Sequence, residues 1–125
     1  MEPQNCVLLV DDNQLIRHSL RKIFEQAGWE VCGEAANGLE AIEEAERLHP
    51  LVIVLDFAMP EMNGLTAARI LKQKMPSVHL ILFTMHDSRL TDEAASAGVD
   101  AVFLKTEPIT GLLQKAESFR APQAA

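Results

Sequence analysis

The sequence lacks a long apolar run, and it lacks a block of Lys and Arg residues. No run approaches the about 20 apolar residues of a membrane-spanning helix, so we expect no membrane span. The net charge is -7, and without clustered cations to neutralise phosphates we expect no direct nucleic-acid binding. Residues 1–5 lack the basic and apolar segments of a signal peptide. These absences leave the cytoplasm as the expected location.

Cysteine is also scarce, with Cys6 and Cys32 the two thiols of the chain and no metal-type spacing between them. Each lies in a strand-like apolar run, which predicts reduced, buried packing residues. Hydrophobic residues make up 48% of the 125 positions, enough for one globular domain with its own core. We expect residues 1–120 to form this domain and residues 121–125 to be a tail or the stub of a linker.

Short apolar segments alternate along the chain with segments of helical periodicity. The strands are expected at residues 6–10, 30–35, 51–55, 78–84 and 101–104. Five such β-α units imply a doubly wound parallel sheet with helices on both faces, and the wholly apolar third strand predicts a central position. The fourth helix, about residues 88–97, has only a thin Ala-rich stripe, so we expect it to be held loosely.

Acidic residues follow two of the expected strands. Asp11 and Asp12 end the first strand and Asp56 ends the third; neighbouring strands lie ~4.8 Å apart, so adjacent strands would bring these carboxylates close together. Ligands of such sheets bind at the carboxyl ends of the strands, where Thr84 and Lys105 also fall. Singly, each residue has a plain alternative, such as an Asp that caps the next helix. Together they suit a Mg2+ site beside a carboxylate nucleophile for phosphoryl transfer.

A family resemblance is carried by Asp11, Asp12, residues 56–64 (DFAMPEMNG), Thr84 and Lys105. With these motifs the chain resembles the receiver domain of bacterial two-component response regulators, over nearly its whole length. The resemblance implies a CheY-like, flavodoxin-like fold with strand order 2-1-3-4-5, an order taken over from the family. Residues 36–41 and 84–86 resemble the subfamily that usually carries a helix-turn-helix DNA-binding output domain.

The resemblance also implies roles for the site residues. Asp56 would be the phosphoacceptor for a sensor histidine kinase, and Lys105 would pair with the phosphoryl group. Mg2+ would be bound by Asp12, Asp56 and the Ala58 carbonyl, with Asp11 binding directly or through water. Beyond its own phosphorylation and dephosphorylation, the chain would not be an enzyme.

Phosphorylation in the family acts as a conformational switch. Thr84 would move toward the phosphoryl group and Phe103 would change rotamer, although Phe103 could equally be plain core. The surface of the fourth helix, fifth strand and fifth helix would then control an output domain, a partner or a phosphorylation-induced homodimer. Kinase contacts would fall near Leu15, His18 and residues 106–108.

Several positions depart from the common family pattern or vary within it. Thr106 stands where many relatives have proline, so no cis peptide is assumed before it. Met85 replaces a small residue and could narrow access to the phosphoryl group. Ala58 and His86 occupy the two variable positions that tune loss of the phosphoryl group to water, and their net effect is left open.

Three other functions compete with a phosphorylated receiver. A pseudo-receiver would act as an interaction module without phosphate. A phosphatase of the haloacid dehalogenase type would need two acids separated by one residue, whereas Asp11 and Asp12 are adjacent. A flavodoxin would need a phosphate-binding loop after the first strand, and the acids there would repel phosphate.

Overall fold

The computed structural model describes residues 4–85 and 90–120, with the side chains of residues 90 and 91 excluded. The strands are β1 (Gln4–Val10), β2 (Glu30–Ala35), β3 (Pro50–Leu55), β4 (His79–Thr84) and β5 (Ala101–Leu104). The helices are α1 (Gln14–Gln26), α2 (Gly38–Leu48), α3 (Gly64–Lys74), α4 (Leu90–Ser96) and α5 (Thr110–Ser118). Every predicted strand is present, within two residues of its expected ends.

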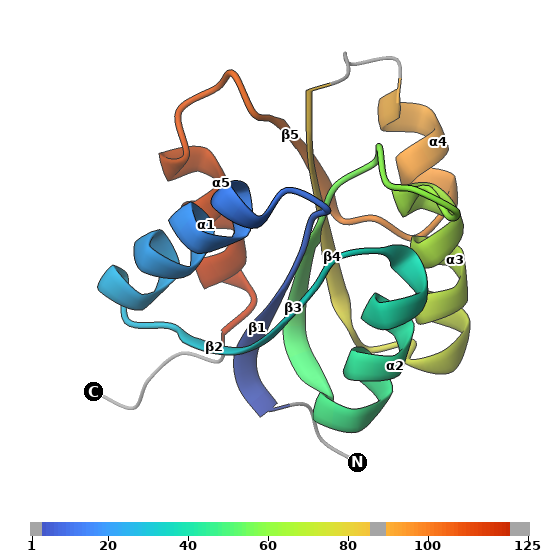
Figure 1. Ribbon diagram of the computed structural model, residues 1–125, viewed down its shortest axis with the longest axis horizontal. Coiled ribbons are helices and arrows are strands. Elements are labelled where there is room, and N and C mark those ends of the chain that lie inside the picture. The colour runs from blue at the N-terminus through green and yellow to red at the C-terminus, as the bar shows by residue number, and fades with distance from the viewer. Residues whose placement is uncertain (1–3, 86–89, 121–125) are drawn as a thin grey trace.

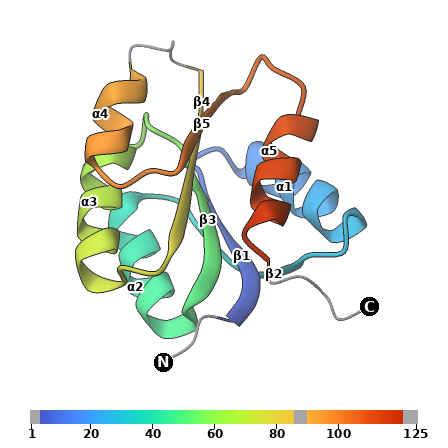
Figure 2. The ribbon, with the colours of Figure 1, turned by 180° about the vertical axis from the view of Figure 1, so that it is seen from behind.

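The strands form one parallel sheet in the order β2-β1-β3-β4-β5. Helices α1 and α5 cover one face of the sheet, and α2, α3 and α4 cover the other (Figures 1 and 2). The predicted doubly wound, flavodoxin-like fold is therefore confirmed. Because all strands run in one direction, the residues that follow β1, β3, β4 and β5 meet at the same edge of the sheet.

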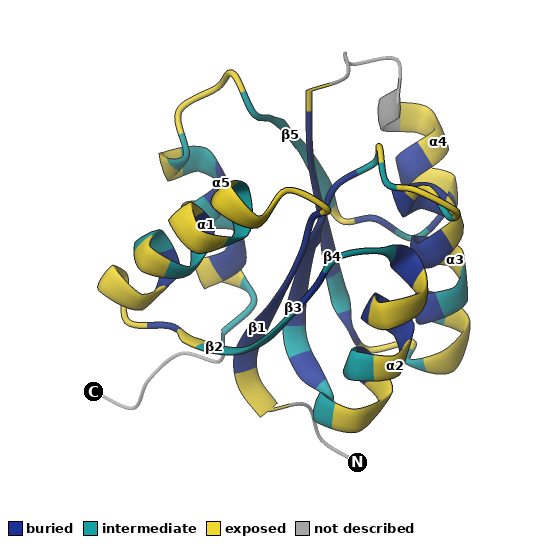
Figure 3. Ribbon diagram, in the orientation of Figure 1, coloured by how far each residue is buried: buried dark blue, intermediate teal, exposed yellow. Residues whose placement is uncertain are grey.

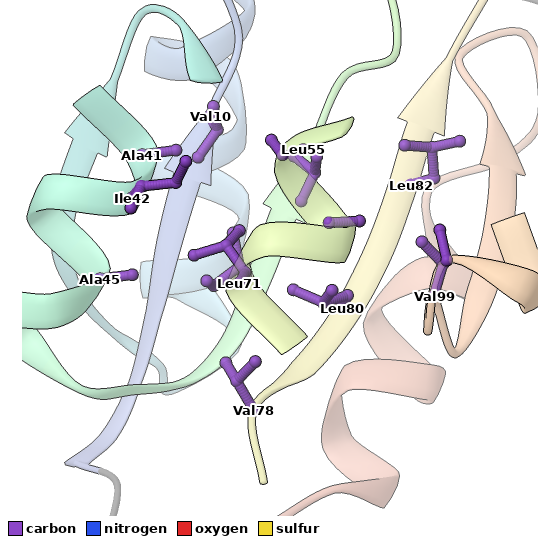
Figure 4. Close-up of a cluster of buried hydrophobic side chains, with 14 of the residues drawn as sticks. Val10, Ala41, Ile42, Ala45, Leu55, Leu71, Val78, Leu80, Leu82 and Val99 are labelled. Carbon is purple, nitrogen blue, oxygen red and sulfur yellow. The ribbon is translucent and has the colours of Figure 1, made fainter. Parts of the chain in front are cut away.

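Two apolar cores hold the layers together, one on each face of the sheet. The three inner strands, β1, β3 and β4, are mostly buried (Figure 3), and β3 is buried along almost its whole length, as a doubly covered strand should be. Beneath α2 and α3, Leu55, Leu71 and Leu80 belong to one core (Figure 4). Beneath α1 and α5, Phe24 and Leu112 belong to the other. Both cores fix the strand ends that carry the candidate site.

The prediction of two reduced cysteines is wrong in this structure, which joins Cys6 and Cys32 in a disulfide with a Cα–Cα distance of 5.6 Å. The β1–β2 register shifts at this point, because Val7 pairs with Val31 while Leu8 pairs with Gly33. Cys32 is thus the extra residue of a bulge on an edge strand. Apolar patterning did not reveal this bulge, whose extra residue is one of the two bonded cysteines.

Two expectations fall partly or wholly outside the described residues. The start of the fourth helix includes residues 88 and 89, and the suggested tail is residues 121–125. Within the described part of α4, Ala94 is buried, and the loose packing of this helix stays a prediction. Among the described helices, none has the length and apolarity needed to cross a bilayer.

Candidate functional site

The three acids converge at the carboxyl edge of the sheet. We call Asp11, Asp12 and Asp56 the acid corner; one carboxylate oxygen from each lies within 4.8 Å of the others. Asp11 and Asp56 are buried, at 2% and 5% exposure, and Asp12 is exposed. The predicted convergence of these side chains is confirmed, whereas their roles are still predictions.

Backbone hydrogen bonds fix the two buried acids beyond the ends of their strands. The Asp11 N–H donates to the Ala35 carbonyl at 3.1 Å, and the Asp56 N–H donates to the Val10 carbonyl at 3.0 Å. The sheet ladder therefore extends one residue past β1 and β3, onto the acids themselves.

Helix capping does not explain the paired acids after β1. Asn13 is the N-cap of α1, and its side chain accepts hydrogen bonds from the N–H groups of Leu15 and Ile16. Asp11 instead accepts the N–H of Asn13 with one oxygen, at 2.9 Å. The alternative that Asp11 or Asp12 serves as the cap is therefore excluded.

Lys105 supplies the positive charge of the site. Its Nζ lies 2.7 Å from Asp11 Oδ2 and 3.3 Å from Asp56 Oδ2, and its side chain is only 10% exposed. Its backbone N–H donates to the Thr84 carbonyl at 2.8 Å, which ties it to β4. Burial alone would lower the pKa of Lys105, but the Asp11 hydrogen bond and the charges of Asp56 and Asp11 raise the pKa above its ordinary value. The ammonium therefore stays charged at neutral pH.

The Asp56 carboxyl has a raised pKa. Burial is the largest cause, and the Asp11 charge raises the pKa further, while Lys105 and the Ala58 backbone N–H lower it. A buried carboxylate with few compensating partners is poorly solvated. It therefore has much to gain from a cation, and it is a better nucleophile than a fully hydrated acid.

The loop after Asp56 is held close to it. The Gly64 N–H, at the start of α3, donates to the Phe57 carbonyl at 2.9 Å. A Cβ on Gly64 would lie 2.3 Å from the Asp56 carbonyl oxygen, so only glycine allows this approach. Farther along the loop, Met62 packs against Gly38 at the start of α2. The position of Asp56 is thus set by β3 on one side and by two helix ends on the other.

The acid corner fits a hard divalent cation. Its ligand atoms are all carboxylate oxygens, the donors that Mg2+ prefers. Three carboxylates face one ammonium, and a divalent cation would balance the remaining negative charge. The exposure of Asp12 leaves one side open to the waters that Mg2+ retains.

The other predicted site residues lie around this cluster. Thr84 is fully buried at the end of β4. Ala58 is exposed in the loop after Asp56, and the role of its carbonyl stays a prediction. Phe103 is half-buried, with its ring packed against Gly111 of α5. His86 lies outside the described residues.

Two of the departures from the family pattern are clarified by the structure. Met85 is 66% exposed and lines a groove with Leu15, so its side chain extends toward the surface of α1. No cis peptide occurs between described residues, so the bond before Thr106, whose isomer the sequence left open, is trans.

Sequence reasoning missed three charged residues beside the acid corner. Glu34 in β2 accepts hydrogen bonds from Arg17 and Arg21 of α1, and Arg17 also donates to the Asp11 carbonyl. The available signal was a charged residue inside a strand pattern, together with two arginines one helical turn apart.

Comparisons with known proteins agree with this geometry. Residues 7–117 match the response regulator receiver domain family. The chain is 38% identical over 100 residues to chemotaxis protein CheY of Thermotoga maritima, covering 79% of this chain and 83% of the relative. A LuxR-family two-component response regulator from Aurantimonas sp. SI85-9A1 superposes with a TM-score of 0.86 at 30% identity, covering 90% of this chain and 81% of that one.

Other relatives are much longer than this chain. It is 45% identical over 104 residues to a protein-glutamate methylesterase/protein-glutamine glutaminase of Archaeoglobus fulgidus, covering 82% of this chain but only 29% of the relative. The similarity therefore covers less than a third of that protein.

Proposed function

Because the chain belongs to the response regulator receiver domain family of two-component systems, we propose that it is a switch driven by phosphorylation of Asp56. The observation that carries this proposal is the placement of the buried Asp56 carboxylate within 3.3 Å of the Lys105 ammonium, inside an acid corner suited to Mg2+. The phosphoryl donor would be a phosphohistidine of a sensor histidine kinase.

The transfer can be written with the residues of the site. A carboxylate oxygen of Asp56 forms a bond to phosphorus, the bond between phosphorus and the histidine nitrogen breaks, and its electron pair returns to the imidazole. Lys105 offsets the charge of the phosphoryl oxygens. Asp11, Asp12, Asp56 and the Ala58 carbonyl would hold Mg2+, which when bound supplies the remaining positive charge.

The response to phosphorylation would be a population shift between two states. A phosphoryl group on Asp56 would draw the hydroxyl of Thr84, and Phe103 would leave its place against Gly111. The α4-β5-α5 surface would then differ between the two states. The partly buried position of the Phe103 ring supports this role, since a rotamer change there does not require opening of a sealed core.

A groove beside the acid corner is proposed as the kinase contact. Leu15, Met85, Lys105, Glu107 and Ile109 are among the residues that line it. Leu15 and Met85 are 77% and 66% exposed, which is high for large apolar side chains. A docked partner would cover this apolar surface and reach the entrance of the phosphoryl site.

The output is proposed to be transcription regulation through a DNA-binding domain or another partner, in the cytoplasm. The LuxR-family response regulator among the solved structures supports this proposal, and homodimerisation on phosphorylation is compatible with it. The methylesterase activity of the longer relative is not carried over, because the chain spans only 29% of that protein. A phosphate-independent interaction module is the alternative.

Acetyl phosphate with Mg2+ tests the proposal directly. Intact-mass spectrometry should show one added phosphoryl group on the wild-type chain and none on the Asp56→Asn variant. An unmodified wild type would favour the phosphate-independent module. Equal modification of wild type and variant would place the acceptor elsewhere.

A further inference from the structure

The peptide that joins Asp11 to Asp12 is held by an arginine. Arg17, one turn into α1, donates from Nη1 to the carbonyl oxygen of Asp11. This carbonyl belongs to the bond between two residues of the acid corner. Its orientation therefore sets the directions in which both side chains leave the backbone.

Arg17 is itself held by a carboxylate of the neighbouring strand. Its Nε donates to Glu34 Oε1 at 3.0 Å, and the other Glu34 oxygen accepts from Arg21 Nε at 2.8 Å. The Arg17 and Glu34 side chains are 15% and 28% exposed. Burial alone would raise the pKa of Glu34, but the hydrogen bonds from Arg21 and Arg17 hold the pKa below its ordinary value. Glu34 is therefore ionised at neutral pH.

Strand β2 thus fixes both backbone groups of Asp11, its N–H and its carbonyl. Ala35, directly after Glu34, accepts the Asp11 N–H at 3.1 Å. Glu34 orients the arginine that binds the Asp11 carbonyl. Strand β2 contributes no ligand to the acid corner, yet it holds the backbone of the residues that do.

We propose that Arg17 is a positioning residue, which holds the Asp11–Asp12 peptide in the orientation that directs both carboxylates at the metal. The inference rests on the proposed function, because it assumes that the acid corner binds Mg2+. Among the described residues, Arg17 makes no hydrogen bond or ion pair with a carboxylate of the acid corner, so its effect passes through the Asp11 carbonyl.

Charge and positioning predict opposite effects for the loss of Arg17. By charge alone, removal of a nearby cation should strengthen Mg2+ binding. Loss of the Asp11 carbonyl contact should weaken binding, since residues that orient ligands typically matter roughly 10-fold or more to metal affinity. Arg21 is the matched control, because it also pairs with Glu34 but makes no hydrogen bond or ion pair with Asp11.

The experiment is Mg2+ titration by calorimetry of the wild type and the Arg17→Ala and Arg21→Ala variants, without a phosphodonor. We expect the Kd to rise roughly 10-fold for Arg17→Ala and to stay within about 2-fold of wild type for Arg21→Ala. Arg17→Lys keeps the charge, but one ammonium cannot reproduce the fork that reaches both Glu34 and the Asp11 carbonyl. Arg17→Lys should therefore also bind Mg2+ weakly, and it replaces Arg17→Ala in the test if that variant does not fold.

A second readout does not depend on the metal. In metal-free protein, the amide resonance of Asp12 should shift more in Arg17→Ala than in Arg21→Ala, because the first variant loses a hydrogen bond to that same peptide. The positioning role alone would be overturned if both arginine variants bound Mg2+ as tightly as wild type, or if both weakened Mg2+ binding equally. A wild type that takes up no Mg2+ would contradict the proposed function, and the positioning role with it.

Discussion

The two ends of the sheet are built from different interactions. At the carboxyl end, three carboxylates and Lys105 crowd together. At the amino end, Arg120 stacks over Trp29 at 3.9 Å, and His79 stacks on Phe119 with ring centroids 3.9 Å apart. We call Trp29, His79, Phe119 and Arg120 the aromatic end. We expect the aromatic end to contribute mainly to stability, and the carboxyl end to carry the chemistry of the proposed function.

Trp29→Ala should have the largest effect on stability and little effect on chemistry. Trp29 is 4% exposed and meets Phe24 edge-on with centroids 5.8 Å apart. Its loss should lower the free energy of unfolding by about 3–5 kcal/mol, measured by urea denaturation. The fraction that stays folded should still accept a phosphoryl group from acetyl phosphate. A stable Trp29→Ala protein would remove the proposed difference between the two ends.

Asp56→Asn should have the opposite effect and stabilise the fold. We expect its free energy of unfolding to rise by an amount on the order of 1 kcal/mol in metal-free buffer at pH 7. The raised pKa of Asp56 means that its ionised form costs stability in the folded state. Lys105 keeps its 2.7 Å partner Asp11 in the variant, so no ammonium is left unpaired. The gain should shrink as pH falls toward 3.8, because the folded wild-type carboxyl, with its raised pKa, takes up a proton at a higher pH than the unfolded one does. Paired thermal melts at several pH values check this; a pH-independent gain would assign it to packing.

Asp12→Ala should also raise the melting temperature without Mg2+. The gain in the free energy of unfolding should be only about a few tenths of a kcal/mol, because Asp12 is exposed and water screens its repulsion. The same variant should gain less stability than wild type from added Mg2+. Thermal melts with and without Mg2+ measure both effects. An unchanged response to Mg2+ would remove Asp12 from the metal ligands.

His79→Phe should have the smallest effect, visible only in acid. Burial lowers the pKa of His79 below 6.5, only partly opposed by Asp100. Below pH 6.5 the unfolded chain therefore binds a proton that the folded chain resists, and the wild type loses stability as pH falls. Phe keeps the stacking on Phe119, and the buried His79 Nδ1 has no hydrogen bond to lose. The variant should lose less stability than wild type between pH 7 and 5, measured by denaturation at several pH values. Parallel plots of stability against pH for the two proteins would contradict this account.

The sheet and the acid corner could be predicted because their signals are local. Apolar strands that end in Asp11, Asp12 and Asp56 identify both a parallel fold and its reactive edge, since strand ends must meet there. The Cys6–Cys32 disulfide could not be predicted, because it depends on a register shift that leaves no periodic trace. The Arg17 contact with the Asp11 carbonyl was missed for a related reason, since a side chain that binds backbone has no sequence partner to find.

The separation of the two ends has a consequence for protein engineering. The turn between α3 and β4 contains the exposed residues Pro76 and Ser77, at the amino end of the sheet. New chain termini or an inserted reporter at this turn would leave every strand that carries an acid connected to its own loop. The chain could therefore be opened there, as in a circular permutant, while keeping the residues of the reactive edge in place.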